Sequence, residues 1–244
     1  GAGFTGIELA GALAEGRPEY AKVAGVAPSE VKITVVEAAT RLLPMFSEKL
    51  ADYGVKLVES LDVELLCGAK ISEVAPGEVV YEKDDQTNSL KAETIIWTTG
   101  VSGSPVVGES NLQERRGRVV VTDNLTDPNF DDLYILGDVA AVMDKESGRP
   151  YPTTAQIATE MAVYAAKDLE SQINGNGHLS VPFVYKSKGT VASVGNTHGF
   201  GVIGKLEIKG YPASMMKKMI MNKSLFEIGG FKEFIAKGRF DLYH

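Results

Sequence analysis

The sequence predicts an α/β fold built from dinucleotide-binding units, and three observations lead to this prediction. The 244-residue chain opens on GAGFTG, in which Gly1, Gly3 and Gly6 have the GxGxxG spacing. A β-branched segment at 31–37 ends in Glu37. A second apolar segment, YILGD at 134–138, ends in a Gly-Asp pair and precedes a helical pattern. Helix and strand patterns that alternate in this way are typical of α/β proteins.

The opening glycines are the first element that this fold requires. In a dinucleotide-binding unit the first glycine permits a tight turn, the second lets the backbone approach the phosphates, and the third lets helix and strand pack closely. We assign these roles to Gly1, Gly3 and Gly6 and expect a helix to follow, with an apolar face. A lone GxGxxG is a weak signal, because glycine-rich turns are common.

Glu37 is the second required element. A carboxylate at the end of the next strand accepts hydrogen bonds from the adenosine ribose, and it disfavours the 2′-phosphate of NADPH. Glu37 follows Gly6 by 31 residues, which exceeds the usual spacing of about 20. We attribute the excess to residues 16–30, which have the composition of a helix extension and a surface loop. The alternative is that Glu37 is an ordinary solvated strand end.

Later segments continue the alternation. Residues 93–100, ETIIWTTG, have the pattern of a β-branched strand that runs into Gly100. Residues 106–140 are expected to end in the YILGD strand, and residues 152–173 form a predicted helix capped by Thr153 or Thr154. Two short strand patterns and an amphipathic end follow from about residue 175.

Composition narrows the class of protein. The chain is 44% hydrophobic and has one cysteine, so Cys67 can form neither an internal disulfide nor a CxxC pair. It has no apolar run of the roughly 18 residues that a membrane span needs. It begins without methionine and without a signal-peptide pattern. We therefore expect a fragment of a longer protein on the cytosolic side.

Charge is distributed unevenly along the chain. Residues 205–244 carry eight Lys/Arg against four Asp/Glu, a net charge of +4, whereas the whole chain carries −7. An acidic body with a basic tail argues against a nucleic-acid partner and favours an anionic surface such as lipid.

Six motifs, taken together and in this order, resemble one known family over essentially the whole chain. They are GAGFTGIE, TVVEAATRLLPMFSE, IIWTTGVSGS, YILGDVA, PTTAQIA and MKKMI…EIGGFKEFIAKGRF. The family is type II NADH dehydrogenase, the single-subunit flavoprotein NADH:quinone oxidoreductase. The resemblance implies an α/β fold of two nested Rossmann-type domains, with FAD and NADH as cofactors, and a C-terminal α+β membrane-anchoring region.

The resemblance also implies a domain division and a reaction. Residues 1–104 correspond to the NADH domain without its first strand, 105–174 to the second half of the FAD domain, and 175–244 to a C-terminal membrane-association region. Hydride passes from NADH to FAD, and two electrons then reach a membrane quinone of a respiratory chain, without proton pumping. The expected partners are NADH, a membrane quinone, the cytoplasmic face of the cell membrane, where the protein is peripheral, and a possible second copy in a homodimer.

Alternatives to this reaction stay open. One is another FAD/NAD(P)H oxidoreductase, of the ferredoxin reductase or sulfide:quinone reductase type, although sulfide oxidation needs paired thiols. The other is that the fragment alone is a non-catalytic nucleotide-binding module. We expect the 244-residue piece itself to be largely inactive.

Several site residues in the second half follow from the resemblance. Gly137 and Asp138 match the second FAD motif, in which the aspartate accepts a hydrogen bond from the flavin ribitol. Ala155 and Gln156 match a helix start that stabilises charge on the reduced flavin, and Gln156 can donate to a quinone carbonyl. The AQxAxQ motif is matched in part, because Glu160 replaces the second glutamine. Glu160 is therefore either a catalytic residue or a solvated helix residue.

Three further residues complete the predicted site. Glu8 is placed near the nicotinamide, although it could instead simply complement the helix dipole. Lys218 is our candidate to approach the flavin or quinone, and the alternative is that Lys217 and Lys218 form a solvated or lipid-facing edge. Gly100 is assigned to cofactor binding. We expect no metal site, because His178, His198 and His244 lack metal-ligand spacing.

The tail has an amphipathic pattern. Met215, Met216, Met219 and Ile220 fall on one helical stripe, with Lys217 and Lys218 expected to point away from it. Phe231, Phe234 and Ile235 repeat the arrangement. Such a helix suits the lipid headgroup region, and the alternative is a core or dimer interface.

Overall fold

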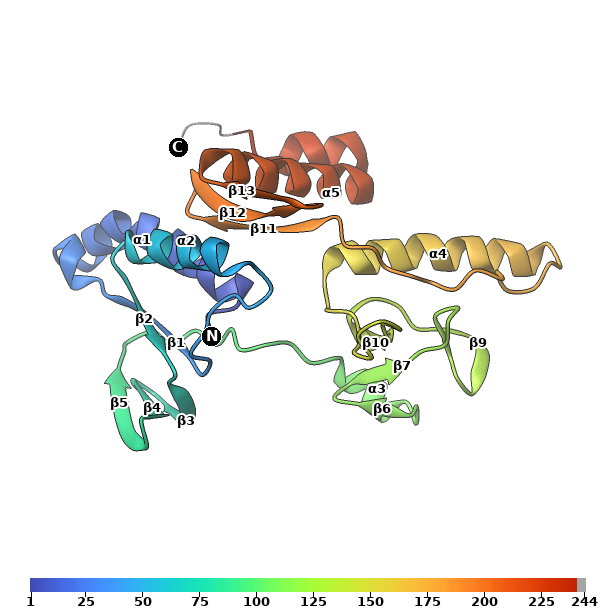
Figure 1. Ribbon diagram of the computed structural model, residues 1–244, viewed down its shortest axis with the longest axis horizontal. Coiled ribbons are helices and arrows are strands. Elements are labelled where there is room, and N and C mark those ends of the chain that lie inside the picture. Colours follow the sequence, from blue (N-terminus) through green and yellow to red (C-terminus); the bar gives the residue numbers. More distant parts are fainter. Residues whose placement is uncertain (241–244) are drawn as a thin grey trace. The chain divides into compact units, whose positions relative to one another are not determined.

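The computed structural model describes residues 1–240 and divides into two compact units (Figure 1). Unit 1 contains residues 1–100 together with the segment that starts at 187, and unit 2 contains residues 101–186. Each unit has its own hydrophobic core. The domain boundaries expected from the sequence, at 1–104, 105–174 and 175–244, stay predictions.

Unit 1 begins with a parallel α/β arrangement. The chain forms α1 (Phe4–Ala24), a short turn of helix η1 (Pro28–Glu30), β1 (Ile33–Glu37), α2 (Glu48–Glu59) and β2 (Val63–Cys67). β1 and β2 pair in parallel from Ile33 opposite Val63 to Glu37 opposite Cys67. α1 extends to Ala24 and stops at Gly25 in the left-handed conformation (φ 71°). The predicted helix extension before the surface loop is thus confirmed.

A meander follows in unit 1. β3 (Lys70–Ala75), β4 (Glu78–Lys83) and β5 (Gln86–Lys91) form an antiparallel sheet in the order β3-β4-β5. Asp84 and Asp85 join β4 to β5, and both have positive φ, 52° and 58°. Two consecutive left-handed residues match the twist of a tight hairpin, which short aspartate side chains tolerate.

The C-terminal segment is part of the unit 1 core. β11 (Gly189–Val194), β12 (His198–Ile203) and β13 (Leu206–Lys209) form an antiparallel sheet that contacts α1, α2 and α5 (Tyr211–Lys237). Phe200 of β12 is fully buried and meets Phe46 edge to face at 5.5 Å. A Cβ built on Gly54 of α2 would lie 2.5 Å from the Phe200 ring, so glycine is needed there.

α5 is two helical segments rather than one straight helix. Gly230 breaks it with φ 67° and ψ −165°, and the chain after Lys237 folds back toward the first segment. The side chain of Asn222 donates to the carbonyl of Arg239 at 2.9 Å and accepts from its N–H at 2.7 Å. Phe234 meets Phe226 and Phe240 edge to face, so an aromatic cluster fills the hairpin.

Unit 2 is built around one long helix, α4 (Ala155–Ile173). The elements that precede it are short: α3 (Pro105–Glu109), β6 (Glu114–Arg115), β7 (Arg118–Val120), β8 (Thr126–Asp127), β9 (Phe130–Tyr134), the turn of helix η2 (Gly137–Val139) and β10 (Ala140–Ala141). Ile157 and Met161 of α4 pack against Val119, Leu125 and Ile135 in the core of the unit.

Of the two predicted strands at 93–100 and 134–138, the first does not form and the second coincides with β9 only at Tyr134. Residues 93–100 pair with no described strand, and Trp97 is 61% exposed. β9 ends at Tyr134, after which Ile135 donates its N–H to the carbonyl of Leu125 at 2.9 Å instead of extending a ladder. A β-branched pattern becomes a strand only where a neighbouring strand accepts its hydrogen bonds. Among the described helices, none combines the length and the apolar character needed to cross a membrane.

Candidate functional site

The opening turn in unit 1 has a closed side and an open side. Gly3 is the N-cap residue of α1, and Ile7 donates its N–H to the carbonyl of Gly3 at 3.0 Å. A Cβ built on Gly6 would overlap the carbonyl oxygen of Gly1, so only glycine fits between helix and turn. A Cβ built on Gly3 would meet nothing within 4 Å. Gly6 is thus needed for packing, whereas Gly3 faces free space.

Glu37 lies directly beside this turn. Its Oε2 accepts the N–H of Ala2 at 2.7 Å, and its Oε1 accepts the N–H of Ala39 at 3.0 Å. Burial alone would raise the pKa of Glu37, but the N–H groups of Ala39 and Ala2 outweigh it and hold that pKa below its ordinary value. The carboxylate is therefore ionised at neutral pH and retains lone pairs for further donors.

Gly100 is the last residue of the first segment of unit 1. Its φ is +85°, which favours glycine, and a Cβ built there would meet nothing within 4 Å. The preceding Thr98 donates from Oγ1 to the carbonyl of Gly1 at 3.1 Å. The end of the 93–100 segment is thus tied to the opening turn, so Gly1 and Gly100 lie in one region of unit 1.

Glu8 connects three elements of unit 1. Its Oε1 accepts the N–H of Ser193 at 2.9 Å and the hydroxyl of Ser193 at 3.3 Å, both from β11. The same oxygen lies 2.9 Å from Nζ of Lys217 in α5. About two turns further along α1, Glu15 accepts the N–H of Asn196 with both oxygens, at 2.7 and 2.8 Å. Two carboxylates therefore dock α1 onto the C-terminal sheet.

The alternative of a solvated or lipid-facing edge is wrong for Lys217 and Lys218. Lys217 forms the ion pair with Glu8, and Lys218 is only 6% exposed, so both point toward the protein. Met219 and Ile220 of the predicted apolar stripe are exposed, so the two lysines point away from them, as expected. The carboxylate of Glu8 accounts for the inward position of Lys217, because it offers a partly buried partner that periodicity alone does not reveal.

The unit 2 site combines a glycine turn with a helix start. Gly137 has φ +72° and donates its N–H toward Sδ of Met161 at 3.2 Å. Asp138 follows it in η2 and is exposed. Thr154 caps α4 and accepts the N–H of Ile157 at 3.3 Å, which decides between the two predicted caps. η2 packs against α4, so Asp138 and the start of that helix belong to one surface of unit 2.

Ala155 and Gln156 occupy the first two positions of α4. Backbone N–H groups in the first turn of a helix have no intrahelical acceptor. Glu160 follows Gln156 by four residues, so both side chains lie on one face of α4. Both are partly buried. The five site residues predicted for the flavin-binding part therefore all lie in unit 2: Gly137, Asp138, Ala155, Gln156 and Glu160.

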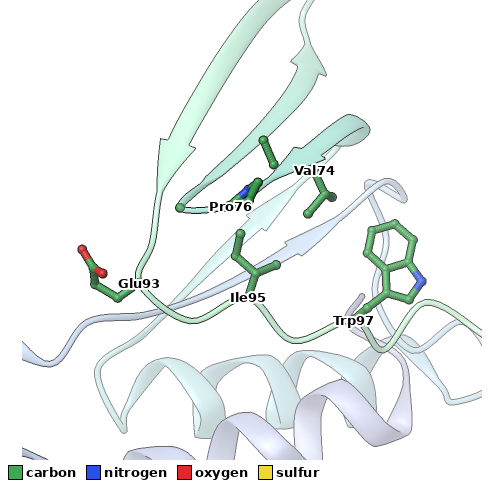
Figure 2. A pocket seen from close by; sticks show the side chains of 7 residues that line it. Val74, Pro76, Glu93, Ile95 and Trp97 are labelled. Carbon is green, nitrogen blue, oxygen red and sulfur yellow. The ribbon is translucent and has the colours of Figure 1, made fainter.

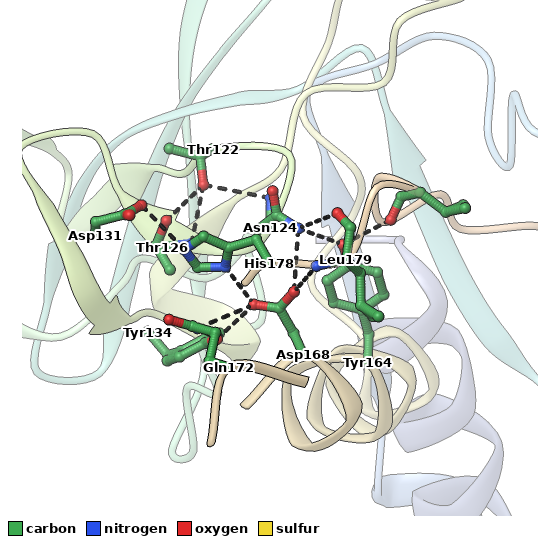
Figure 3. Close-up of polar contacts among 11 residues, drawn as sticks. Thr122, Asn124, Thr126, Asp131, Tyr134, Tyr164, Asp168, Gln172, His178 and Leu179 are labelled. Carbon is green, nitrogen blue, oxygen red and sulfur yellow. Dashed lines mark hydrogen bonds and ion pairs between the residues drawn. The ribbon is translucent and has the colours of Figure 1, made fainter. Parts of the chain in front are cut away.

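A buried polar cluster in unit 2 was missed by the sequence analysis (Figure 3). Its centre is Asp168 of α4, whose side chain is fully buried. Oδ2 of Asp168 accepts from the Tyr134 hydroxyl at 2.5 Å and contacts Nδ1 of His178 at 2.6 Å, while Oδ1 accepts the N–H of Leu179 at 2.6 Å. Longer contacts come from Asn124 Nδ2 at 3.3 Å and Gln172 Nε2 at 3.5 Å. We call these six residues the Asp168 network.

Asp168 and Tyr134 of the Asp168 network shift each other's pKa. Burial alone would raise the pKa of Asp168, but the donors led by Tyr134 and Leu179 lower it. Burial and the bond to Asp168 raise the pKa of Tyr134 to about 12. One signal could have found the network: Asp168 continues the buried stripe of Ile157, Met161 and Ala165 along α4. A carboxylate in an apolar stripe requires partners.

An open pocket lies in unit 1, apart from the opening turn. It is lined by the β3–β4 turn and by the 93–97 segment, with the side chains of Val74, Ile95 and Trp97 at its wall (Figure 2). None of the predicted site residues lines it. Among the described residues, no cluster of three or more His, Cys, Asp or Glu has the arrangement of a metal site.

Comparison with known proteins places this site in a class. A family model described as pyridine nucleotide-disulphide oxidoreductase matches residues 1–162. The chain belongs to this family. It is 39% identical over 240 residues to the type II NADH:quinone oxidoreductase of Staphylococcus saprophyticus, and 40% identical to that of Staphylococcus haemolyticus. These relatives confirm the resemblance found in the motifs.

Each of these alignments covers 98% of this chain and 59% of the relative, so the chain spans about three fifths of their length. Two solved structures share the fold. NDH2 from Plasmodium falciparum in complex with NADH matches with a TM-score of 0.84 at 16% identity, over 97% of this chain and 63% of that one. The sulfide:quinone oxidoreductase of Aquifex aeolicus matches at 0.64 and 17%, over 93% and 57%.

Proposed function

We propose that this chain supplies the NADH site and part of the flavin site of a type II NADH:quinone oxidoreductase. The observation that carries the proposal is the 39–40% identity to staphylococcal enzymes of that name over 98% of the chain. In this reaction NADH is oxidised, a membrane quinone is reduced, and FAD is the cofactor between them. The residues of both units fit these groups.

In unit 1 the opening turn suits a dinucleotide. Gly3 leaves free space at the N-terminus of α1, where backbone N–H groups and the helix dipole favour phosphate. Ionised Glu37 is the acceptor for the adenosine ribose, and its charge selects NADH over NADPH. Gly1, Gly6 and Gly100 let the backbone turn or pack closely around that site.

In unit 2 the residues suit the ribitol and ring end of FAD. Flavin, when bound, supplies the hydride-accepting and electron-donating chemistry. The carboxylate of Asp138 accepts a hydrogen bond from a ribitol hydroxyl, and the left-handed turn at Gly137 positions Asp138 for this contact. The N–H groups of Ala155 and Gln156 stabilise negative charge at the start of α4. The side-chain amide of Gln156 can donate to a quinone carbonyl.

Glu8 is the proposed contact to the nicotinamide. Its Oε1 is committed to Ser193 and Lys217, which fix the carboxylate in one orientation and leave Oε2 to accept the carboxamide. Lys217 also balances the carboxylate charge. Lys218 and Glu160 keep their proposed catalytic roles at the flavin and quinone.

The proposed membrane contact uses the hairpin of α5. Ile228, Phe231 and Ile235 are exposed on it, and Lys232 and Lys237 lie among them. An apolar surface with interspersed lysines suits anionic lipid headgroups. We place it at the cytoplasmic face of the cell membrane, where a lipid-soluble quinone would be reached, and we retain a homodimer as a further arrangement to test.

The sulfide:quinone reductase alternative is less well supported. The match to such an enzyme is at 17% identity and shows the fold alone. Cys67 is also the single cysteine of the chain, and it is unpaired. A thiol pair cannot form from these residues.

The proposal is tested by comparing NADH and NADPH as donors to a water-soluble quinone. The assay uses a protein of the relatives' full length, with this chain in parallel. We expect NADH oxidation at least about tenfold faster than NADPH oxidation, a preference of about 1.4 kcal/mol, and little activity from the chain alone. Equal rates with both donors would contradict the role of Glu37. No quinone-dependent oxidation by the flavin-loaded longer protein would contradict the function.

A further inference from the structure

The Asp168 network joins two segments that carry the predicted flavin contacts. Tyr134 ends β9, and Gly137 begins η2 three residues later. Asp168 holds Tyr134 from the C-terminal half of α4, and Met161 accepts the N–H of Gly137 nearer its start. The 134–137 segment is therefore fixed to α4 at both ends.

We propose that Asp168 is a positioning residue, which holds the Gly137–Asp138 turn against the first turns of α4 through Tyr134, and that His178 makes this hold depend on a proton. Its relevance to flavin rests on the proposed function. The contacts of the Asp168 network do not depend on that function. Asp168 lies 13 residues after Ala155, which is about 20 Å along a helix, so it acts at a distance from the site.

His178 is the member of the network that can change charge near neutral pH. Two carboxylates face it: Asp168 of α4 at 2.6 Å from Nδ1, and Asp131 of β9 at 3.2 Å from Nε2. The phenol groups of Tyr134 and Tyr164 face Asp168 from the other sides. The bond to Asp168 raises the pKa of His178, burial opposes it, and Asp131 adds to the increase.

The direction of the effect follows from linkage. A histidine whose pKa is raised in the folded state stabilises that state fully below its ordinary pKa of about 6.5, and the contribution is lost as pH rises through the raised value. Deprotonation leaves the buried Asp168 carboxylate without its charged partner. Neutral donors alone then compensate the buried charge, so opening of the network, which releases Tyr134, costs less free energy.

The experiment is amide hydrogen exchange on the full 244-residue chain between pH 5 and 9, corrected for the intrinsic pH dependence of exchange. Three proteins are compared: wild type, His178→Gln, and His198→Gln. His198 lies in β12 of unit 1, so its substitution is a matched control outside the network. Tyr134→Phe removes the link between Asp168 and β9 without touching His178.

In the wild type and His198→Gln, we expect protection of the Leu179 and Gly137 amides to fall, by about tenfold, as His178 deprotonates. His178→Gln should remove this pH dependence at both amides. Tyr134→Phe should retain it at Leu179 and lose it at Gly137.

Two results would overturn the proposal. One is a pH response at Leu179 with none at Gly137 in the wild type, which would make the network a local fastening of the 174–179 loop. The other is a uniform loss of protection in His178→Gln that includes the core amide of Val119, which would mean a general effect on the stability of unit 2. Flavin is not needed for either readout, so failure of the proposed enzymatic function would be recognised separately by the quinone assay.

Discussion

Nζ of Lys217 lies 2.9 Å from Oε1 of Glu8, and this ion pair joins the last helix of the chain to the first. Both side chains are about three quarters buried. Glu8 also accepts from Ser193, so one carboxylate organises α1, β11 and α5. A residue predicted to serve the nicotinamide thus also ties the C-terminal segment to the nucleotide-binding half of unit 1.

Lys217→Ala should destabilise unit 1 by about 1 kcal/mol, because it leaves a partly buried carboxylate with neutral donors alone. Urea unfolding followed by circular dichroism would measure the change. Lys223→Ala is the matched control, since its pair with Glu227 is solvent-exposed and should contribute at most about 0.5 kcal/mol. Equal effects of the two substitutions on the free energy of unfolding would mean that the Glu8–Lys217 pair stabilises the protein no more than an exposed pair does.

Gly3→Ala separates folding from nucleotide binding. The backbone of Gly3 has φ −68°, and a Cβ there meets nothing, so stability should change by less than about 0.5 kcal/mol. The methyl group would nevertheless occupy the space proposed for phosphate. NADH affinity, measured by fluorescence titration, should fall at least about tenfold, or 1.4 kcal/mol. Unchanged affinity would place the phosphates elsewhere.

Gly6→Ala is the complementary substitution. Its Cβ would overlap the carbonyl oxygen of Gly1, so the start of α1 must move, at a cost of about 1–3 kcal/mol. Thermal unfolding would detect this as a lower melting temperature than that of Gly3→Ala. Wild-type stability in Gly6→Ala would show that the turn can relax.

The stability of unit 2 should also depend on acid. The lowered pKa of Asp168 means that its contribution is present above the ordinary aspartate value, about 3.9, and is lost as pH falls through the lowered pKa. Asp168→Asn should remove about 2–3 kcal/mol at pH 6. It should also flatten the acid limb of a plot of unfolding free energy against pH. An unaltered acid limb would exclude Asp168 as its cause.

The α5 hairpin should bind anionic vesicles. A Phe231→Ser/Ile235→Ser double variant should lose most of its co-sedimentation, because it removes two exposed apolar side chains from the proposed lipid contact. Val23→Ser, at an exposed position at the end of α1, is the control and should bind like the wild type. Binding should also weaken at high salt, since lysines contribute. Equal binding by all three proteins would move the contact away from α5.

Local patterns predicted much of the fold. The glycine turn, the strand ending in Glu37 and the Thr154-capped helix are set by short-range rules of turn geometry, periodicity and capping, and each appears in the structure. The 93–100 segment could not be judged in this way, because a strand depends on its neighbour and none of the described strands pairs with it. The strand expected at 134–138 was misplaced for the same reason, since β9 is Phe130–Tyr134.

The site was predictable where short motifs contain its residues. Gly137, Asp138 and the start of α4 are close in sequence and lie together in unit 2. The Glu8–Lys217 pair joins residues more than two hundred positions apart, so helical periodicity could not identify the partner of Lys217. The Asp168 network likewise gathers Asn124, Tyr134 and His178 from separate segments, which no spacing rule connects.

The central claim is that these residues serve a flavin which NADH reduces and quinone reoxidises. The most direct measurement is the absorbance spectrum of a protein of the relatives' full length, before and after NADH. The account predicts a flavin band at about 450 nm that bleaches with NADH and returns with quinone, and its absence from the 244-residue chain alone. A folded longer protein that stays colourless with added FAD, or whose flavin NADH does not bleach, would contradict the account.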